Sequence, residues 1–395
     1  MMFVPAADAP RAAGHSRAAW DPWLLGAAVA LLALGLVMVH SASVAYATRV
    51  SGNGAYYLVR HAVYMLLGAL CLLVVLRVRI RVWELAGPYL LLIGVASLTV
   101  VLIPGISAHI NGSSRWIKFG LVTLQPAELM KLFMVVYVAG YLVRKQEELR
   151  NFSQGIVMIS LVVAFTGALL LLQPDLGTVV VITTTVLAML FLGGVRFWHF
   201  LLVLAAGLGG MVMLTIVSPY RMGRVTSFLD PWSDPFNRGF QLVQALIAVG
   251  RGEWFGVGLG GSVQKLSYLP AAHTDFIFAV LAEELGLLGV LAVLVLYGVV
   301  MVRAFFIARQ AEVAGAIYTA RLAQGLGLLL GIQAMVNMGV NMGLLPTKGL
   351  TLPFVSYGGS SLLVCCTALA ILLRAERETR GAMVGARAAA RAVFS

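Results

Sequence analysis

Long apolar stretches separated by short polar ones dominate the hydrophobic pattern of this chain. Since a helix that crosses a hydrocarbon core of about 30 Å needs about 20 mostly apolar residues, each stretch is a candidate membrane span. Runs such as 179–182 and 328–330 do not alternate between apolar and polar positions, as membrane β-strands would. Because backbone polar groups must be satisfied internally in lipid, the pattern predicts an all-α, polytopic membrane helix bundle. The ten predicted transmembrane helices are 23–44, 57–76, 85–103, 127–143, 155–172, 176–193, 198–217, 275–300, 318–343 and 359–373.

The composition agrees with this prediction and excludes other classes of protein. Of the 395 residues, 61% are hydrophobic and only 11% are charged, and the mean hydropathy is +0.94. Soluble domains carry about 25% charged residues, so a soluble enzyme, a disordered protein and a disulfide-stapled secreted domain are excluded. The net charge of +12 would suit a nucleic-acid partner, but in a membrane chain basic residues also set orientation.

Lys and Arg are distributed unevenly between alternate connections. If the N-terminus is cytoplasmic, the inner segments carry 17 of the 28 basic residues and the short outer segments carry five. Long translocated loops count little in this comparison. We therefore expect both termini in the cytoplasm, with 1–22 as an N-terminal segment, 23–374 as the membrane domain and 375–395 as a basic tail.

One outer connection, 218–274, is far longer than the others, and long loops of this kind tend to be functional. Within it, Leu242, Ala245, Leu246 and Val249 recur at helical spacing, which predicts an amphipathic helix on the membrane surface. The glycines at 256–261 lack the strand and βαβ unit of a dinucleotide-binding fingerprint, so we interpret them as turning or flexible backbone.

Three acids occupy equivalent places along the chain. Glu128, Asp175 and Asp275 each open a span whose N-terminus is predicted to face outside. Acids in a first turn stabilise a helix by about 0.3–1 kcal/mol, and that is the purely structural interpretation. Three of them at one membrane depth favour a shared outer-facing pocket, because ionisable groups in membrane spans are costly and are commonly functional.

Lys131 lies three residues after Glu128, so the two side chains can pair on one helix face. Such a pair is either structural or holds an anionic substrate, with Glu128 orienting the lysine. Deeper along the eighth span, Glu283 and Glu284 require polar partners within the bundle or a wet cavity. Before the last span, 346–361 combines two prolines with hydroxyl side chains, which suits a substrate groove or a re-entrant turn.

Five motifs resemble those of the SEDS proteins of bacteria (shape, elongation, division, sporulation), over about residues 20–375. The motifs are 111–116 (NGSSRW), 125–131 (QPAELMK), 173–177 (QPDLG), 270–278 (PAAHTDFIF) and 353–361 (PFVSYGGSS). Segments 221–228, 250–254 and 262–270 resemble the cell-division branch of the family. The chain departs from that branch at Gly261, where Asn is usual, and at Ala271, where Glu is usual.

The resemblance implies a peptidoglycan glycosyltransferase that polymerises lipid II into β-1,4-linked glycan outside the cytoplasmic membrane, at the division septum. Asp275 matches the essential aspartate of the family, and Glu128 and Lys131 match its acid–lysine pair. The resemblance also implies a class B penicillin-binding protein transpeptidase and other divisome membrane proteins as partners, alongside membrane lipids and without nucleic acid.

The chemistry suits these residue types. A carboxylate within reach of a sugar hydroxyl can take its proton, a step that contributes about 10²–10⁴-fold, and we expect Asp275 to be this general base. The pyrophosphate leaving group needs positive charge, which basic side chains supply. A divalent cation, Mg²⁺ or Mn²⁺, would add to it, although the sequence shows no complete set of metal ligands. The candidate substrate-binding residues are Arg115, Asp175, Arg221, Arg224, His273, Lys348, Ser356, Tyr357, Gly358, Gly359 and Ser360.

Two other functions remain open at the level of sequence. A lipid II flippase would also use many helices with intramembrane charges, although transporter sites lie near the midplane rather than on the outer side. A non-catalytic scaffold for division partners would not need Asp275.

Overall fold

The computed structural model of the chain describes residues 20–104, 108–110, 113–119, 122–237, 239–266, 269–347 and 349–393. Each predicted span is helical there, which confirms the all-α class. The helices at these places are α1 (Pro22–Ser51), α2 (Tyr56–Val75), α3 (Ile80–Val101), α4 (Pro126–Arg144), α5 (Val157–Leu172), α6 (Leu176–Leu192), α7 (Phe197–Ile216), α10 (Ile277–Val313), α11 (Ile317–Asn341) and α12 (Gly359–Val393).

Eight of the described helices are long and apolar enough to cross a membrane. One of these, in the α5 region, includes the π-helical turn η2 (Phe152–Ile156), which follows the 3₁₀ turn η1 (Glu148–Arg150). Among the described residues, α6, α7 and the helix at Phe240–Arg251 are shorter apolar helices. Several helices exceed their predicted spans: α10 runs on to Val313, and α12 continues to Val393 through the basic tail.

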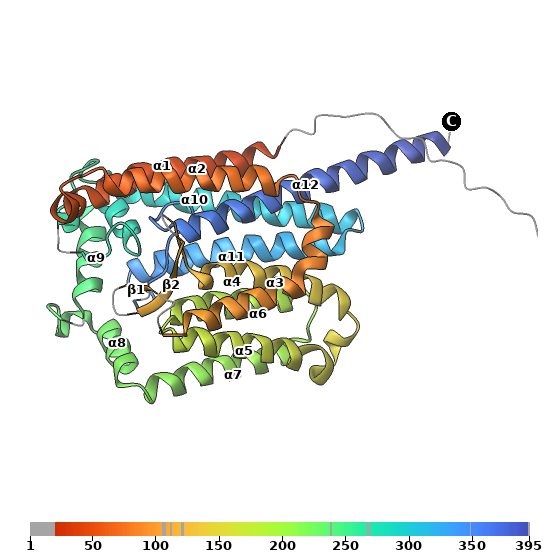
Figure 1. Cartoon of the computed structure of the whole chain (residues 1–395), viewed down its shortest axis with the longest axis horizontal. Coiled ribbons are helices and arrows are strands. Elements are labelled where there is room, and N and C mark those ends of the chain that lie inside the picture. Colours follow the sequence, from red (N-terminus) through yellow and green to blue (C-terminus); the bar gives the residue numbers. More distant parts are fainter. Residues whose placement is uncertain are drawn as a thin grey trace, which may run out of the picture.

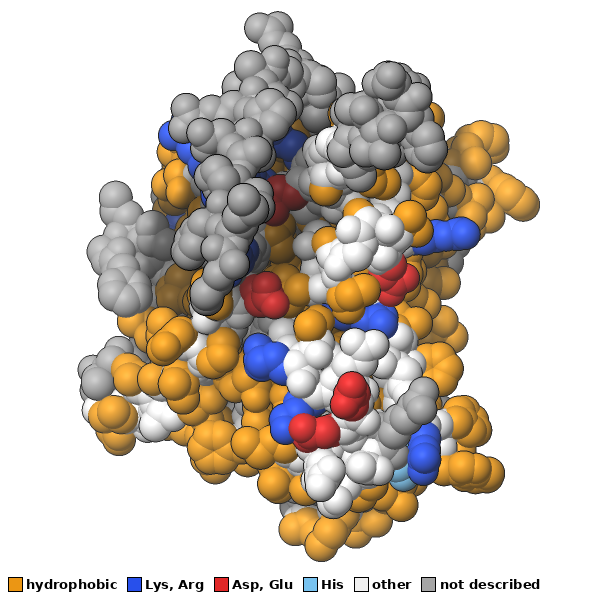
Figure 2. All heavy atoms as spheres, turned by 90° about the vertical axis from the view of Figure 1, so that its right-hand side faces the viewer, with side chains coloured by type: hydrophobic (Ala, Val, Ile, Leu, Met, Phe, Trp, Pro, Cys, Tyr) orange, Lys and Arg blue, Asp and Glu red, His pale blue; other side chains and the backbone are white. Residues whose placement is uncertain are grey.

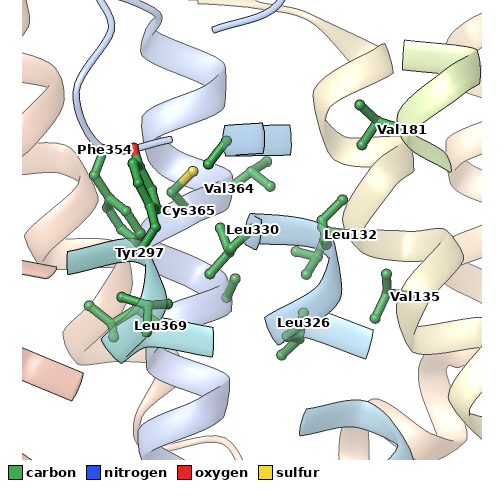
Figure 3. Packing of buried hydrophobic residues seen from close by; sticks show 14 of the residues in the cluster. Leu132, Val135, Val181, Tyr297, Leu326, Leu330, Phe354, Val364, Cys365 and Leu369 are labelled. Atoms are coloured by element: carbon green, nitrogen blue, oxygen red, sulfur yellow. The ribbon is translucent and has the colours of Figure 1, made fainter. Parts of the chain in front are cut away.

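The helices lie roughly side by side, with α11 among α4, α6, α10 and α12 (Figure 1). Leu326 and Leu330 of α11 pack in this core with Leu132 and Val135 of α4 (Figure 3). Tyr297 of α10 closes the other side, where its hydroxyl donates a hydrogen bond to the backbone carbonyl of Pro353. The segment before α12 is therefore buried in protein, which is the condition for irregular backbone at membrane depth.

A small antiparallel sheet departs from the predicted all-helical pattern. It consists of β1 (Ala108–Ile110), β2 (Ser113–Phe119) and β3 (Val122–Leu124), in the order β1-β2-β3. The register pairs Ala108 with Trp116 and Ile117 with Leu124. Two of the strands, β1 and β3, have only three residues and are too short for an alternating pattern to reveal. The sheet lies at the end of the bundle where α8 and α9 also lie, here called the sheet end (Figure 1).

The long connection 218–274 contains α8 (Pro219–Leu229), η3 (Pro231–Ser233), α9 (Phe240–Arg251) and η4 (Gln264–Leu266). The predicted amphipathic helix is confirmed as α9. Its apolar face is not left free for lipid, however, because Leu242 and Ala245 are buried and α9 packs on α10 and α11. Protein, rather than the membrane surface, covers the apolar side of this helix.

The helix α10 is interrupted at Gly286, whose φ of 64° and ψ of −163° are not helical. The loop after α9 fills the break: Leu287 N donates to Glu253 O at 2.9 Å, and Val257 N donates to Glu283 O at 2.9 Å. A Cβ on residue 286 would lie 2.4 Å from the amide nitrogen of Gly256. The glycine-rich stretch is thus tightly turning backbone that supplies hydrogen-bond partners for the backbone groups left free at the break in α10.

Glu283 and Glu284, the two acids beside the break, have polar partners within the bundle. Of the two possibilities left open by the sequence, polar partners or a wet cavity, the structure shows the first. Glu284 accepts hydrogen bonds from Lys265 Nζ at 2.6 Å and from Ser41 Oγ at 2.7 Å. Glu283 accepts from Ser262 Oγ at 2.5 Å and from the backbone amide of Val263 at 3.2 Å. These bonds tie the long connection to α1 and α10.

The opposite end of the bundle, from which α12 projects, gathers charged side chains inside an apolar rim (Figure 2). Arg303 of α10 forms an ion pair with Asp21 at 2.5 Å, and the backbone amide of Asp21 donates to Glu376 of α12 at 3.0 Å. The start of α1 and the far part of α12 are therefore held at the same end.

We expect Gly286→Ala to lower the free energy of unfolding by about 1–3 kcal/mol, because a side chain at positive φ is strained and here meets backbone atoms. Thermal unfolding of the purified chain in detergent measures the change. Gly298→Ala on the same helix is the matched control, since its Cβ would meet nothing within 4 Å. Equal melting temperatures for the two variants would contradict the prediction.

Candidate active site

A cavity of about 850 Å³ opens at the sheet end. Its walls come from β2, from the N-terminal ends of α4 and α6, and from the segments that precede α10 and α12. All three acids singled out in the sequence, Glu128, Asp175 and Asp275, line it, together with Arg115, Tyr357 and Ser360. The shared pocket expected from their positions is therefore present.

Asp175 serves both interpretations of a first-turn acid. It is the N-cap of α6, where its Oδ1 accepts from the backbone amide of Thr178 at 3.2 Å. Its Oδ2 accepts from Thr178 Oγ1 at 2.9 Å. The cap leaves Asp175 in the cavity wall, so stabilising the helix and shaping the pocket do not exclude each other.

Glu128 and Lys131 form the predicted ion pair, with Lys131 Nζ 2.8 Å from Glu128 Oε1. Lys131 is 1% exposed and also donates to Gln333 Oε1 of α11 at 2.7 Å. Gln333 in turn donates to the carbonyl of Thr351 at 2.9 Å. Glu128 reaches the cavity wall, whereas the lysine lies behind it and is occupied by protein partners.

Asp275 lies in a tight turn just before α10, rather than in the first helical turn. The carbonyl of Ala271 accepts hydrogen bonds from the backbone amides of Thr274, Asp275 and Phe276, which delays the start of the helix to Ile277. Ala271 itself has a φ of 56°, in the left-handed region. The turn directs the Asp275 side chain into the cavity wall.

The backbone of Asp275 is held by two amides of α11. Asn337 Nδ2 donates to its carbonyl at 2.9 Å and Asn341 Nδ2 donates to the same oxygen at 3.0 Å. Asn341 Oδ1 also accepts from the Ala279 amide at 3.1 Å. On the carboxylate side, a Cβ at Gly349 would lie 3.0 Å from Asp275 Oδ2, so glycine leaves room for the acid.

Burial raises the pKa of Asp275 to about 7; the nearby Asp175 also raises it, and Arg115 lowers it. Arg115 donates to the carbonyls of Gln173 and Pro174, both at 2.7 Å. The guanidinium thus fixes the turn that carries Asp175 while contributing positive charge to the cavity. A carboxyl group that titrates near neutral pH suits a general base.

The segment before α12 has a mixed role. Tyr357, Gly358 and Ser360 line the cavity, and Ser360 Oγ accepts from the Gln125 amide at 2.9 Å. Ser356 instead braces the backbone, donating to the carbonyl of Thr274 at 2.6 Å. Gly359 packs against α2, because a Cβ there would lie 2.3 Å from the Tyr64 ring.

The remaining predicted site residues are placed as follows. His273 does not line the cavity, but its carbonyl accepts from the Tyr357 amide at 3.0 Å, which joins the two loops. Arg221 and Arg224 lie in α8, and their side chains are outside the described structure. Lys348 is also outside the described residues. Among described residues, no group of three or more His, Cys, Asp or Glu side chains is placed to hold a metal ion.

Sequence reasoning missed three polar residues of α11. Gln333, Asn337 and Asn341 are at most 3% exposed and connect Lys131, Asp275 and the segment before α12. Their spacing of four residues in the second, mostly apolar half of the span places them on one helix face, and this signal was available in the sequence.

Comparison with known proteins identifies the relatives of this architecture. The profile of the cell cycle proteins FtsW, RodA and SpoVE matches residues 22–381. This chain belongs to that family. The resemblance to SEDS proteins is thereby confirmed, and the chain is a multi-pass membrane protein.

Individual relatives are similar over most of their length. A probable peptidoglycan glycosyltransferase FtsW of Nitrosococcus halophilus is 56% identical over 370 residues, which are 94% of this chain and 95% of the relative. Its counterpart in Thioalkalivibrio sulfidiphilus is 51% identical, over 89% of this chain and 88% of that protein.

Solved structures share the fold. One chain comes from a peptidoglycan synthase complex described for its structural coordination of polymerization and crosslinking. It has a TM-score of 0.75 at 31% identity and covers 91% of this chain and 98% of its own. The rod shape determining protein RodA of Thermus thermophilus has a TM-score of 0.65 at 28% identity, with the same coverage.

We expect Lys131→Met to lower the free energy of unfolding by about 3–5 kcal/mol, because it leaves the Glu128 carboxylate buried without its partner. Adding Glu128→Gln should restore part of the loss. Lys145→Met is the matched control: Lys145 pairs with Glu148 near the other end of α4, where both side chains are more than a third exposed, and such pairs contribute about 0–1 kcal/mol. Denaturant unfolding in detergent compares the variants, and equal effects at the two lysines would refute the prediction.

Proposed function

We propose that this chain is a peptidoglycan glycosyltransferase that polymerises lipid II into β-1,4-linked glycan for septal wall synthesis during cell division. The proposal rests on the Asp275 carboxylate in the wall of a polar cavity. Two asparagines of α11 hold this residue in place by hydrogen bonds to its backbone carbonyl. The relatives from Nitrosococcus halophilus and Thioalkalivibrio sulfidiphilus are each named as a probable peptidoglycan glycosyltransferase FtsW, which supports the same activity.

In the proposed reaction a sugar hydroxyl of one glycan attacks the anomeric carbon of the other in a single displacement. The new bond joins the hydroxyl oxygen to the anomeric carbon, while the bond from that carbon to the pyrophosphate oxygen breaks. The Asp275 carboxylate takes the hydroxyl proton. Its raised pKa makes it a stronger base than an exposed aspartate, and it remains partly ionised near pH 7.

The leaving pyrophosphate carries negative charge that the protein must offset. Arg115 is the arginine that lines the cavity among the described residues, so we assign it this role. Arg221, Arg224 and Lys348 complete the proposed set. Because Lys131 is engaged by Glu128 and Gln333, we assign it the role of holding Glu128 and the wall of the cavity, rather than direct contact with the pyrophosphate.

We extend the proposal to partners and location. A solved relative belongs to a complex of polymerization and crosslinking, which supports a class B penicillin-binding protein transpeptidase and other divisome membrane proteins as partners. We place the chain in the bacterial cytoplasmic (inner) membrane at the septum. The Lys and Arg side chains at the end of the bundle from which α12 projects support cytoplasmic termini and an outer-facing cavity (Figure 2).

The cavity's position also bears on the alternatives. A flippase needs a site accessible from both leaflets, and transporter sites lie near the bilayer midplane. This cavity instead lies at the sheet end, against β2 and the N-termini of α4 and α6. A polymerase working on one side of the membrane suits that position better than a flippase or a non-catalytic divisome scaffold does.

Asp275→Asn should abolish glycan formation from lipid II, with a loss of about 10²–10⁴-fold, because an amide cannot accept the proton. The assay uses the purified chain reconstituted with its partner transpeptidase. Asp230→Asn, an exposed carboxylate of the same connection, is the control and should polymerise normally. Retained polymerisation by Asp275→Asn would exclude it as the base, and translocation of lipid II by wild type without polymerisation would support the flippase.

The rate of polymerisation should rise with pH through an apparent pKa of about 7. The base must be deprotonated, so activity falls about tenfold per pH unit on the acid side of that value. Because Arg115 lowers the pKa of Asp275, Arg115→Gln should move this limb to higher pH. A profile that stays flat between pH 5 and 8 would contradict the assignment.

A further inference from the structure

A cluster of aromatic rings continues from the cavity wall toward the outside of the molecule. Tyr357 lines the cavity, and its ring meets the ring of Tyr57 edge to face at 5.2 Å. Tyr57 lies 4.6 Å from the His273 ring, and Tyr46 stacks on His273 at 5.7 Å. The four rings come from α1, α2 and the loops before α10 and α12, so only the tertiary fold unites them.

The outer side of this cluster is open. Tyr46 is 49% exposed, whereas a packing tyrosine of the core such as Tyr297 is 5% exposed. Tyr56, whose ring contacts that of Tyr57, is 38% exposed. The Tyr56 hydroxyl accepts a hydrogen bond from Arg60 at 2.6 Å. Core packing alone does not account for aromatic surface that is left accessible next to a cavity.

The four rings themselves are uncharged, with polar edges, and one cation lies beside them: the Arg60 guanidinium is 5.5 Å from the centre of the Tyr56 ring. Burial lowers the pKa of His273 to about 4, so the imidazole is uncharged at neutral pH. Burial likewise raises the pKa of Tyr357 to about 12, which keeps its hydroxyl as a donor. Rings of this kind present an apolar face and a polar tip. Pyranose rings have the matching character, with C–H groups on their faces and hydroxyls at their edges.

We propose that Tyr46, Tyr57, His273 and Tyr357 form a carbohydrate subsite that holds sugar rings of the glycan strand next to the pair reacting at Asp275. His273 precedes Asp275 by two residues, and Tyr357 is in both the cavity wall and the cluster, so a chain seated on the rings leads directly to the base. This inference rests on the proposed function and adds the place where the strand is held during elongation.

Tyr46→Ala tests the subsite, because Tyr46 is half exposed and its loss leaves the inner rings packed. We expect about three- to tenfold weaker binding of a soluble, unbranched β-1,4-linked GlcNAc–MurNAc oligosaccharide, from the usual size of one aromatic contact. Calorimetry with the full chain in detergent measures it. Glycan made from lipid II by the same variant should be shorter, while the initial coupling of two lipid II molecules keeps its rate.

Tyr46→Trp should retain binding, and Tyr89→Ala, an exposed tyrosine of α3, is the matched control. Melting temperatures establish that each variant is folded. Tyrosines also anchor helices at membrane interfaces, and in that case Tyr46→Ala would lower thermal stability without changing oligosaccharide affinity or strand length, which overturns the subsite.

The outcomes separate the subsite from the proposed activity. If wild type binds the oligosaccharide through Tyr46 but makes no glycan, the subsite stands and the proposed activity fails. If wild type polymerises and Tyr46→Ala matches it in both affinity and strand length, the activity stands and the subsite is wrong. If wild type neither binds nor polymerises, both are wrong.

Discussion

Polar groups buried in an apolar bundle must find partners within the protein, and the arrangement of the cavity depends on this constraint at α11. Gln333 binds Lys131 of α4 and the segment before α12, while Asn337 and Asn341 bind the carbonyl of Asp275. One helix face therefore connects the acid–lysine pair to the proposed base. Because each amide has several donors and acceptors to satisfy, a shift of one element leaves buried polar atoms unpaired.

The same constraint explains how irregular backbone is tolerated around the cavity. The break in α10 at Gly286 is satisfied by amides and carbonyls of the loop after α9, and Glu283 and Glu284 anchor that loop by their side chains. The turn that carries Asp275 likewise closes on the carbonyl of Ala271. The long connection 218–274 is thus a structural part of the bundle, and its fixed backbone positions the residues that precede α10.

Charged side chains at the two ends of the molecule have different surroundings. At the end from which α12 projects, arginines pair with acids such as Asp21 and Glu376 and lie inside an apolar rim (Figure 2). At the sheet end, a few charged side chains surround one cavity. Burial there raises the pKa of Asp275, Arg115 lowers it and Asp175 raises it. We therefore interpret the arginines at the first end as orientation signals and the charged residues around the cavity as candidate catalytic or binding residues.

The sequence by itself determined the ten helices, the pairing of Glu128 with Lys131 and the acids that share a cavity, because apolar length and helical spacing are local properties. Only the tertiary structure decided which groups meet across the bundle. Asn337 reaches Asp275 from 62 residues away, and Tyr46 stacks on His273, with no trace in either local pattern. The short strands of the sheet and the break at Gly286 depend equally on hydrogen bonds to distant backbone, which no pattern of hydrophobicity records.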